Sequence, residues 1–516
     1  MKFEIKSKYL IFPVNNFATS KTMCFYKDGK EVYKLNIRLD NVAPDYYAYI
    51  DLSRFYGSVL NISVSPDMEI KFTEADEINI EGLYNEVYRP QIHFTTKNGW
   101  INDPNGLIYF NGEYHMFYQH NPCENNWGNM HWGHAVSKDM IHWEERDIAL
   151  FPDMTGAMFS GCAIVDEKNL LGLQSGDVKT VLLYYTATEP YMQYVAYSTD
   201  GLKSVKKLDK AVVPTIEKFN RDPKVIFCEE WGAYVMALYL EKDVYGLLRS
   251  DDLLNWKLMQ KIAMSGDREC PDLFSITADN GEKMWVLMGA NDRYIVGKMQ
   301  KNSFVPVQDA ASLNYGGTAY AGQSFSNLED GRCVRIDWDR WNISTPRISG
   351  QMSIPCELSL KEYDERYYLC VDPVKELDSL IQSTERFDNL ELKADNKRCI
   401  GIEATPYKIK MKCGGGSGVI KMTLFGCLYT IDLGANLLKY GNGRSVPIAL
   451  TSDGLELTLI VDKCSAELYL DGGKIYSGSV DEKTVCDYNL TSLELLSMSD
   501  VTLEYLEMHK LKSILR

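Results

Sequence analysis

Short apolar runs, rich in β-branched and aromatic residues and divided by turn residues, recur along the whole chain. Three examples are Thr-Val-Leu-Leu-Tyr-Tyr-Thr (180–186), Ala-Tyr-Val-Met-Ala-Leu-Tyr (233–239) and Met-Trp-Val-Leu-Met-Gly (284–289). Runs of this length bounded by Gly, Asn, Asp and Pro are typical of β-strands. Long stretches with helical periodicity are scarce, so the sequence predicts an all-β protein.

A weak internal repeat indicates how these strands are arranged. Ser-Lys-Asp-Met-Ile-His-Trp (137–143) recurs as Ser-Asp-Asp-Leu-Leu-Asn-Trp (250–256), with a degenerate copy at residues 198–202; the copies start 61 and 52 residues apart. A period in the fifties suits four-stranded β-propeller blades. About 270 residues divided by that period predict five blades, although three copies of so short a pattern could also be coincidence.

Tryptophan marks the candidate domain limits, because all nine tryptophans lie between Trp100 and Trp341. Residues 1–87 hold short alternating segments and predict a small N-terminal accessory β domain. Residues 88–362 are expected to form the propeller. Residues 363–516 return to alternation, as in 455–461 and 466–470, which predicts a C-terminal β-sandwich.

Bulk composition restricts the class of partner. The 516 residues are 45% hydrophobic and 24% charged, with a net charge of −16, which argues against nucleic acid or an anionic membrane surface. No run approaches the roughly 18 apolar residues of a membrane span, and the charged first eight residues do not resemble a signal peptide. Thirteen scattered cysteines without a Cys-x-x-Cys pair favour reduced thiols, so a cytoplasmic location is expected. A homo-oligomer remains open.

The segment Trp-Ile-Asn-Asp-Pro-Asn-Gly (100–106) places a carboxylate, Asp103, at a rigid corner before a strand. Pro104 fixes its own φ and favours extended geometry at Asp103. Six of the seven histidines and four of the nine tryptophans fall within residues 93–143. Flat apolar faces and uncharged donors around a carboxylate suit a polar ligand with apolar faces, such as a sugar.

Two further acidic motifs share this pattern of a carboxylate, a nearby proline and a strand. Arg-Asp-Pro places Asp222 119 residues after Asp103, and Glu-Cys-Pro places Glu269 a further 47 residues on. These steps correspond to about two blades and one blade. Because equivalent positions of successive blades converge on the propeller axis, the three acids are predicted to share one pocket. Taken singly, each could be a turn carboxylate.

Together these motifs resemble glycoside hydrolase family 32, the invertase, inulinase and levanase group. The resemblance covers roughly residues 88–360. The further matching motifs begin at His93 (His-Phe), Phe117 (Phe-Tyr-Gln-His-Asn-Pro), Trp127 (Trp-Gly-Asn-Met-His-Trp-Gly-His), Phe159 (Phe-Ser-Gly) and Gly350 (Gly-Gln-Met-Ser-Ile-Pro). The resemblance implies a five-bladed propeller followed by a β-sandwich, and hydrolysis of β-fructofuranosides with retention of configuration.

The resemblance also implies a role for each acid. Asp103 would be the nucleophile that forms a fructosyl-enzyme, and Glu269 the general acid and then the base. We expect a raised pKa for Glu269, from burial or neighbouring negative charge. Asp222 would bind fructose hydroxyls and stabilise the transition state. Arg221 is expected to keep Asp222 ionised and to tune Glu269, or else to form a structural salt bridge.

The remaining predicted substrate-binding residues follow by position. They are the uncharged Asn102, Gln119 and Ser160 and the aromatic Trp100, Trp127, Phe159 and Trp338. Core packing is the alternative for each aromatic. His131-x-x-His134 with His115 and His120 could form a zinc site, or these residues could be buried histidines that hydrogen-bond within the protein. The latter is favoured, since residues three apart on a strand face opposite sides, so no metal and no cofactor is predicted.

The chain departs from the family pattern at three positions. Relatives commonly carry acids where Asn314 and Thr318 stand, which would alter contacts to the leaving group or contacts of the residues behind the site. Cys356 replaces an arginine, which indicates a lost structural ion pair.

The predicted activity is an exo-acting β-fructofuranosidase that acts on sucrose, fructo-oligosaccharides, or levan- or inulin-type fructans. The alternatives are a fructosyltransferase that uses the same intermediate and a non-catalytic fructan-binding protein. The preferred linkage, β-2,1 or β-2,6, and the preferred chain length stay open.

Overall fold

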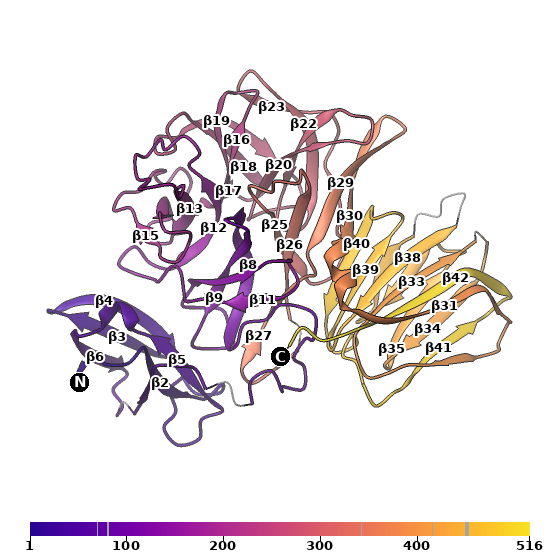
Figure 1. Ribbon diagram of the computed structural model, residues 1–516, viewed down its shortest axis with the longest axis horizontal. Coiled ribbons are helices and arrows are strands. Elements are labelled where there is room, and N and C mark those ends of the chain that lie inside the picture. Colours follow the sequence, from indigo (N-terminus) through magenta and orange to yellow (C-terminus); the bar gives the residue numbers. More distant parts are fainter. Residues whose placement is uncertain (70, 80–81, 342, 415, 449–453, 516) are drawn as a thin grey trace.

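The computed structural model describes residues 1–69, 71–79, 82–341, 343–414, 416–448 and 454–515. Within these residues the secondary structure is almost entirely β, with two short 3₁₀ helices, η1 (Ser53–Phe55) and η2 (Lys375–Leu380). Figure 1 shows three groups of strands in chain order, an indigo group at the N-terminus, a purple-to-pink group in the middle and an orange-to-yellow group at the C-terminus. The all-β prediction is therefore confirmed. None of the helices described is long and apolar enough to cross a membrane.

The N-terminal group consists of two small antiparallel sheets around a shared apolar core. One sheet has the order β1-β6-β3-β4 and the other β5-β2-β7. The strands are β1 (Lys2–Glu4), β2 (Tyr9–Val14), β3 (Lys21–Lys27), β4 (Lys30–Ile37), β5 (Tyr46–Asp51), β6 (Val59–Ser65) and β7 (Thr73–Ala75). The group contacts the middle of the chain through Tyr33, whose hydroxyl lies 2.6 Å from His131 Nε2.

The middle of the chain forms five consecutive sheets, each built around four antiparallel strands. The first sheet contains β8 (Gly99–Phe110), β9 (Glu113–Asn121), β10 (His131–Ser137), β11 (Trp143–Glu145) and β27 (Ile348–Ser349). The second contains β12 (Met158–Val165), β13 (Val181–Ala187), β14 (Met192–Ser198) and β15 (Lys206–Lys207). The third contains β16 (Arg221–Cys228), β17 (Ala233–Glu241), β18 (Val244–Ser250) and β19 (Lys257–Ala263).

The fourth and fifth sheets continue this order. The fourth contains β20 (Asp272–Thr277), β21 (Lys283–Met288), β22 (Arg293–Gln300), β23 (Ser303–Pro306) and β24 (Ala311–Ser312). The fifth contains β25 (Ala319–Ser324), β26 (Cys333–Asp339), β28 (Gln351–Met352), β29 (Cys356–Tyr363) and β30 (Arg366–Pro373). Because β29 runs across residue 362, the fifth sheet extends beyond the predicted limit of the middle domain. The predicted limits themselves stay predictions.

The first strands of the five sheets pack around a common centre, as in a propeller. β12 contacts β8 and β16, β20 contacts β16 and β25, and β25 returns to contact β8. The parallel pairing of β27 with Gly99 and Trp100 at the start of β8 adds to this closure. The ring thus brings the five first strands, which are far apart in sequence, to one axis.

The sequence repeat marks equivalent turns of three blades. In each copy a serine hydroxyl donates to the aspartate two residues on, directly after the third strand of the sheet: Ser137 to Asp139 at 3.0 Å, and Ser250 to Asp252 at 3.1 Å. The degenerate copy at residues 198–202 makes the same bond at 2.8 Å. The repeat was therefore not a coincidence, since it encodes a side-chain-capped turn.

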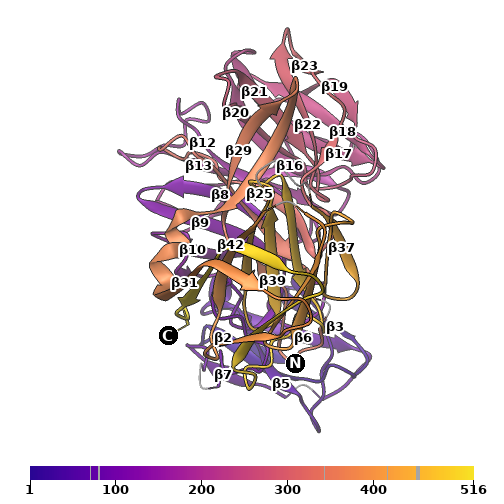
Figure 2. The same ribbon diagram turned by 90° about the vertical axis from the view of Figure 1, so that its right-hand side faces the viewer.

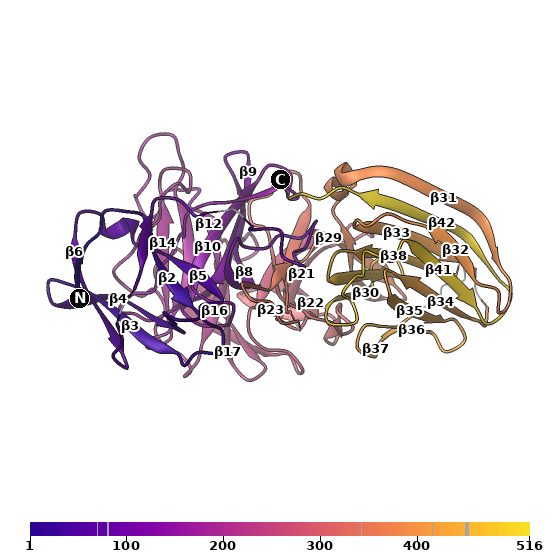
Figure 3. The ribbon, with the colours of Figure 1, turned by 90° about the horizontal axis from the view of Figure 1, so that it is seen from below.

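The C-terminal group is a sandwich of two six-stranded antiparallel sheets, which Figure 3 shows as two layers. One sheet contains β31 (Ile381–Leu392), β42 (Val501–Leu511), β33 (Tyr407–Cys413), β38 (Leu455–Val461), β39 (Ser465–Leu470) and β40 (Ile475–Val480). The other contains β32 (Arg398–Gly401), β41 (Ser492–Ser497), β34 (Val419–Leu424), β35 (Cys427–Asp432), β36 (Leu437–Tyr440) and β37 (Arg444–Pro447). The predicted sandwich is confirmed.

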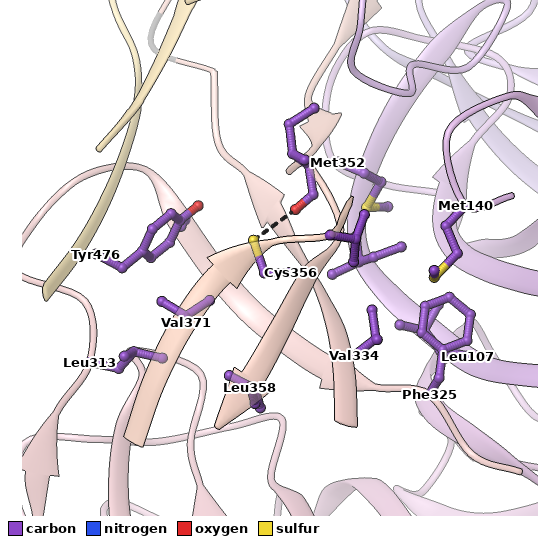
Figure 4. Packing of buried hydrophobic residues seen from close by; sticks show 14 of the residues in the cluster. Leu107, Met140, Leu313, Phe325, Val334, Met352, Cys356, Leu358, Val371 and Tyr476 are labelled. Atoms are coloured by element: carbon purple, nitrogen blue, oxygen red, sulfur yellow. Dashed lines mark hydrogen bonds between the residues drawn. The ribbon is translucent and has the colours of Figure 1, made fainter. Parts of the chain in front are cut away.

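The sandwich packs against the propeller (Figures 1 and 2). One apolar core contains residues of both. Cys356 lies in this core, where its thiol donates to Ile354 O at 3.1 Å (Figure 4). Its sulfur also lies 3.2 Å from the hydroxyl of Tyr469 on β39. A small neutral side chain therefore fills the position where the family pattern has an arginine.

Candidate active site

A cavity of about 660 Å³ lies at the end of the propeller where its first strands begin. It is lined by all three predicted acids and by seven of the eight other predicted site residues. The predicted residues in its wall are Asn102, Asp103, Gln119, Trp127, Phe159, Ser160, Arg221, Asp222, Glu269 and Trp338. A larger cavity of about 750 Å³ is lined by later parts of the same strands, such as residues 224–227 of β16, and holds none of these residues. The smaller cavity is therefore the candidate active site.

Asp103 lies on β8 at an irregularity of the strand. The pairing of β8 with β9 shifts between Ile101 and Pro104, so the strand bulges at the carboxylate. Bulges of this kind re-aim side chains and are frequent beside active sites. Ser160 Oγ donates to Asp103 Oδ2 at 2.6 Å, and the Cys270 thiol donates to the same oxygen at 3.3 Å. These two donors fix one face of the carboxylate.

Asp222 and Glu269 are held by strained backbone. Their φ angles are 62° and 58°, in the left-handed region that residues with a Cβ rarely adopt. Asp222 lies in a bulge of β16 between Arg221 and Lys224, and Glu269 lies just before β20. Such strain is concentrated at functional sites, where the surrounding structure enforces it. Both carboxylates are thus aimed into the cavity by the start of a blade.

Arg221 and Cys270 connect the three acids. Arg221 Nη2 lies 2.6 Å from Glu269 Oε1, and Arg221 Nε lies 3.5 Å from Asp222 Oδ2. The backbone N–H of Cys270 donates to Asp222 Oδ2 at 3.1 Å, and its thiol lies 3.5 Å from the same oxygen. Because that thiol also contacts Asp103, it stands between two carboxylates. Arg221 and Cys270 therefore link the three acids, so that the charge of each acid affects the others.

The structure corrects the expected pKa of Glu269. Burial raises the pKa of Glu269, but the hydrogen bond from the Tyr320 hydroxyl to Oε2 and the charge of Arg221 outweigh it, and the net pKa is lowered. Burial instead raises the pKa of Asp222 to about 7, against the opposing charge of Arg221 and with the help of Asp103 and Glu269. The charge of Arg221 favours the ionised forms of Asp222 and Glu269, in the direction expected, but burial outweighs it at Asp222.

The uncharged residues of the wall are fixed by their neighbours. Gln119 Nε2 donates to Met158 O at 2.9 Å, which ties the first blade to the second. Trp127 is 59% exposed at the rim, with its ring 6.0 Å from that of Phe159. Trp338 is largely buried, and its indole Nε1 has no partner among the described residues. The wall thus combines flat apolar faces with uncharged polar side chains.

Trp100 differs from the other predicted substrate-binding residues, because it does not line the cavity. Its indole Nε1 donates to Asn102 Oδ1 at 2.7 Å. Its ring packs edge-on against Trp338 at 5.6 Å. Trp100 therefore supports the wall from behind and orients the amide of Asn102.

Asn314 and Thr318 also lie away from the cavity. The backbone N–H of Val480 on β40 donates to Thr318 Oγ1 at 3.0 Å, and Asn314 forms a β-bridge with Tyr476. Thr318 N donates to Gly478 O at 2.8 Å. These positions contact the sandwich, so of the two expected effects the structure favours altered contacts behind the site over altered contacts to the leaving group.

The histidines considered for zinc have hydrogen-bond partners within the protein. His115 Nδ1 lies 3.1 Å from His134 Nε2, and burial lowers the pKa of both. His120 Nδ1 lies 2.9 Å from Trp100 O, and His131 Nε2 contacts the hydroxyl of Tyr33. These contacts fit the interpretation as buried hydrogen-bonding histidines.

Seven lining residues were not predicted. They are Tyr191, Phe219, Tyr239, Glu241, Lys242, Cys270 and Tyr320. Cys270 and Tyr320 stand inside motifs of the sequence, the Glu-Cys-Pro segment and the segment 314–323, and could have been found there. Of the others, Tyr239 and Glu241 lie at the end of β17, and Tyr191, Phe219 and Lys242 lie in connections between strands, where no motif marks them.

A pocket with paired carboxylates, aromatic walls and uncharged hydrogen-bonding groups is the arrangement of a glycoside hydrolase. Residues 93–373 match the model of the glycosyl hydrolases family 32 N-terminal domain. The match covers more than half of the chain, and the chain belongs to glycosyl hydrolase family 32.

Sequence similarity to other proteins extends over most of the chain. A levanase of Bacillus subtilis is 31% identical over 493 residues, which cover 84% of this chain and 71% of the relative. An extracellular exo-inulinase of Aspergillus awamori is 28% identical over 458 residues, 77% of this chain and 81% of the relative. The crystal structure of exo-inulinase from Aspergillus awamori aligns with a TM-score of 0.74 at 24% identity, covering 84% of this chain and 99% of that one. That likeness supports the fold.

Proposed function

We propose that the chain is an exo-acting β-fructofuranosidase that releases terminal fructose from sucrose, fructo-oligosaccharides, or levan- or inulin-type fructans. The observation that carries the proposal is the meeting of Asp103, Asp222 and Glu269 in one cavity of the propeller. The names of its relatives, a levanase and an exo-inulinase, support fructans as the substrate class. A cavity of about 660 Å³ is the size of small-ligand sites and suits the end of a sugar chain.

The first chemical step forms a bond between Asp103 and the anomeric carbon of fructose. The bond from that carbon to the leaving oxygen breaks through an oxocarbenium-like transition state, and Glu269 gives its proton to the leaving oxygen. Ser160 and Cys270 donate to Asp103 Oδ2, which leaves Oδ1 as the attacking atom. In the second step Glu269 takes a proton from water, whose oxygen displaces Asp103. Two displacements on one carbon retain its configuration.

Glu269 must gain a proton before it can act as the acid. In the free site its pKa is lowered by Tyr320 and Arg221. A bound sugar excludes water from the carboxyl group and places a hydrogen-bond acceptor beside it, and both effects favour the protonated form. Substrate binding therefore raises the pKa of Glu269 toward the working range.

Asp222 serves the sugar hydroxyls. It is 6% exposed, and this burial raises its pKa to about 7. As a carboxylate it accepts hydrogen bonds from fructose hydroxyls and stabilises positive charge that develops on the ring. Cys270 N–H and Arg221 hold it in place for this role.

Product analysis tests the proposal. The purified protein is incubated with sucrose, 1-kestose, inulin and levan, and free fructose and longer products are separated. The proposal predicts free fructose from the first minutes, with single fructose units leaving the polymers. Dominant chain elongation at high sucrose would identify a transferase, and binding without any product would identify a fructan-binding protein.

Asp103→Asn identifies the nucleophile in the same assay. The amide keeps the shape of the side chain but is a far weaker nucleophile, so fructose release is expected to fall by about three orders of magnitude or more. Asp147→Asn, a substitution at an exposed aspartate outside the cavity, is the matched control. A fully active Asp103→Asn variant would contradict the assignment.

We also propose a cytoplasmic location, which is supported by thirteen cysteines that are all unpaired. Cell fractionation with an antibody to the protein tests it. Self-association stays open and is measured by light scattering.

A further inference from the structure

Three buried side chains from distant parts of the chain meet at the seam between the propeller and the sandwich. His93 precedes β8, Asp339 ends β26, and Glu467 lies on β39. Their potential metal-ligating atoms all lie within 4.8 Å of one another, and their exposed fractions are 1%, 0% and 0%. This cluster is separate from the active-site cavity, whose wall contains none of the three residues.

The His93 ring is oriented as a metal-binding imidazole usually is. Its Nδ1 lies 2.8 Å from Asp462 Oδ2, and the same carboxylate accepts the N–H groups of Gln91 and Ile92. A carboxylate that accepts the Nδ1 proton fixes the tautomer and turns Nε2 outward as a ligand. Nε2 then faces Glu467.

The spacing between His93 and Glu467 fits two corners of a tetrahedron. His93 Nε2 lies 3.3 Å from Glu467 Oε1, which is long for a hydrogen bond to a charged group. Two ligands about 2.0–2.1 Å from one zinc ion at a tetrahedral angle lie about 3.3 Å apart. Both Glu467 oxygens also accept hydrogen bonds that hold the carboxylate in place, Oε1 from the Ile354 N–H at 3.0 Å and Oε2 from the Tyr469 hydroxyl at 2.6 Å.

Two buried oxygens at the same place have no partner within the described residues. They are Asp339 Oδ1 and Tyr476 Oη. A Cβ on Gly478 would lie 3.1 Å from the first and 2.8 Å from the second, so only glycine leaves this space open. Unsatisfied oxygens that face a common space, fully removed from water, are costly unless something positive binds them.

The charges of the cluster favour a cation. Asp339, Asp462 and Glu467 are three carboxyl groups, and the basic side chain of His93 contacts two of them, Asp462 and Glu467. Protonated His93 forms hydrogen bonds with Asp462 and Glu467 but not with Asp339. A divalent cation can instead bind His93, Asp339 and Glu467 together.

We propose that His93, Asp339 and Glu467 bind a divalent metal ion of the zinc type, which links the propeller to the sandwich. One imidazole and two carboxylates form a ligand set that zinc accepts, and Tyr476 or a water completes four-coordination. The ion has a structural role, because the site is closed to solvent. It departs from the expectation of no metal, which considered only the histidines at 115, 120, 131 and 134.

Metal analysis of the intact protein tests the site. The protein is treated with a chelator and incubated with zinc chloride or cobalt chloride. Unbound metal is then removed, and the metal bound per chain is measured by elemental mass spectrometry. The proposal predicts one ion per chain, a tetrahedral cobalt absorption spectrum and a higher thermal midpoint with zinc than without it.

Isosteric variants locate the ion. Asp339→Asn is expected to lose at least nine-tenths of the bound metal and the thermal shift, while Asp166→Asn, a fully buried aspartate in the second blade, keeps both. His115→Gln removes a histidine of the other cluster and also keeps both. Equal metal in all variants, or none in the wild type, would overturn the proposal.

A second variant covers the case in which Asp339→Asn does not fold. Glu467→Gln keeps the acceptor for Tyr469 and Ile354 and removes only the charge. The proposal requires that this folded variant also loses the ion. Retained stoichiometric metal in Glu467→Gln would contradict it.

Discussion

Two neighbouring side chains control the charge of Glu269. Tyr320 donates to one carboxylate oxygen, and Arg221 contacts the other at 2.6 Å. Both interactions stabilise the ionised form, so they oppose the effect of burial and lower the pKa. At the scale of single residues, these contacts therefore favour the ionised form of Glu269, which can act as a base, until substrate binds.

Tyr320→Phe is expected to move the pH profile of kcat/KM. The general acid must be protonated, so kcat/KM falls as pH rises through the pKa of Glu269 in the free enzyme. Loss of a hydrogen bond to the ionised form raises that pKa, which shifts the alkaline limb to higher pH by about one unit. Initial rates with sucrose across the pH range measure the shift.

Tyr239→Phe is the matched control, since Tyr239 lines the same cavity but bonds to Lys242 O rather than to Glu269. Its alkaline limb is expected to stay in place. A shift toward lower pH in Tyr320→Phe would contradict the proposed role of Glu269.

Ser160→Ala removes one of the two donors that hold Asp103. A hydrogen bond to a charged group contributes about 1.5–3 kcal/mol, so kcat/KM is expected to fall roughly tenfold to a hundredfold. Ser160→Thr keeps the hydroxyl and should retain more activity. An unchanged kcat/KM in Ser160→Ala would show that this bond does not orient the nucleophile.

The three acids could be predicted because each is tied to a proline and to the start of a strand. The pKa of Glu269 could not, since Tyr320, which lowers it, lies 51 residues further along the chain. Tyr191 and Phe219 reach the rim from loops with no motif, so the sequence gives no reason to single them out.

At the scale of elements, irregular strands shape the site. The first strands of four blades lose their register at the cavity: β8 at Asp103, β12 at Ser160, β16 at Asp222 and β25 beside Tyr320. Each irregularity turns a side chain that regular alternation would place elsewhere. The repeated bulge is what makes one pocket out of separate blades.

Gly161→Ala tests the close packing of one such strand. A Cβ at Gly161 would overlap the carbonyl oxygen of Tyr184 on β13, and backbone cannot yield as a side chain can. Overpacking of this kind costs about 1–3 kcal/mol, so denaturant unfolding should show a lower stability. Gly401→Ala, where a Cβ meets no atom within 4 Å, is the control.

Equal stability of the two glycine variants would contradict the strand packing at β12.

The prediction of elements from sequence was good where side chains cap the turns, as in the Ser-x-Asp repeat. It missed the bulges, because a register shift depends on the partner strand and leaves no local pattern.

At the scale of the whole molecule, side chains join the N-terminal sheets to the rim of the propeller. Arg38 donates to Glu124 Oε1 at 2.9 Å and to Asn125 Oδ1 at 3.1 Å. Glu124 is only 4% exposed. These contacts lie in the segment that leads to Trp127, so the N-terminal sheets support one edge of the active-site rim.

Arg38→Ala would leave Glu124 buried without its charge partner. Breaking a buried ion pair from one side costs about 3–5 kcal/mol, so the thermal midpoint is expected to fall by several degrees. Lys34→Ala, at an exposed position on β4, the strand that ends just before Arg38, should leave the midpoint unchanged. Equal midpoints for both variants would contradict a stabilising role for this contact.

The order of the three β groups could be predicted from tryptophan content and strand patterns. Their contacts could not, since Arg38 and Glu124 lie 86 residues apart and His93 and Glu467 lie 374 apart. Such pairings depend on how finished sheets dock.

The covalent intermediate on Asp103 tests the account most directly. Glu269→Gln, which cannot activate water, is mixed with a fructosyl donor that has a good leaving group, quenched in acid, digested and analysed by peptide mass spectrometry. The account predicts one added fructosyl group on the peptide that contains Asp103. A fructosyl group on Asp222 instead would contradict the account. So would a protein that carries no fructosyl group although the donor's leaving group has been released.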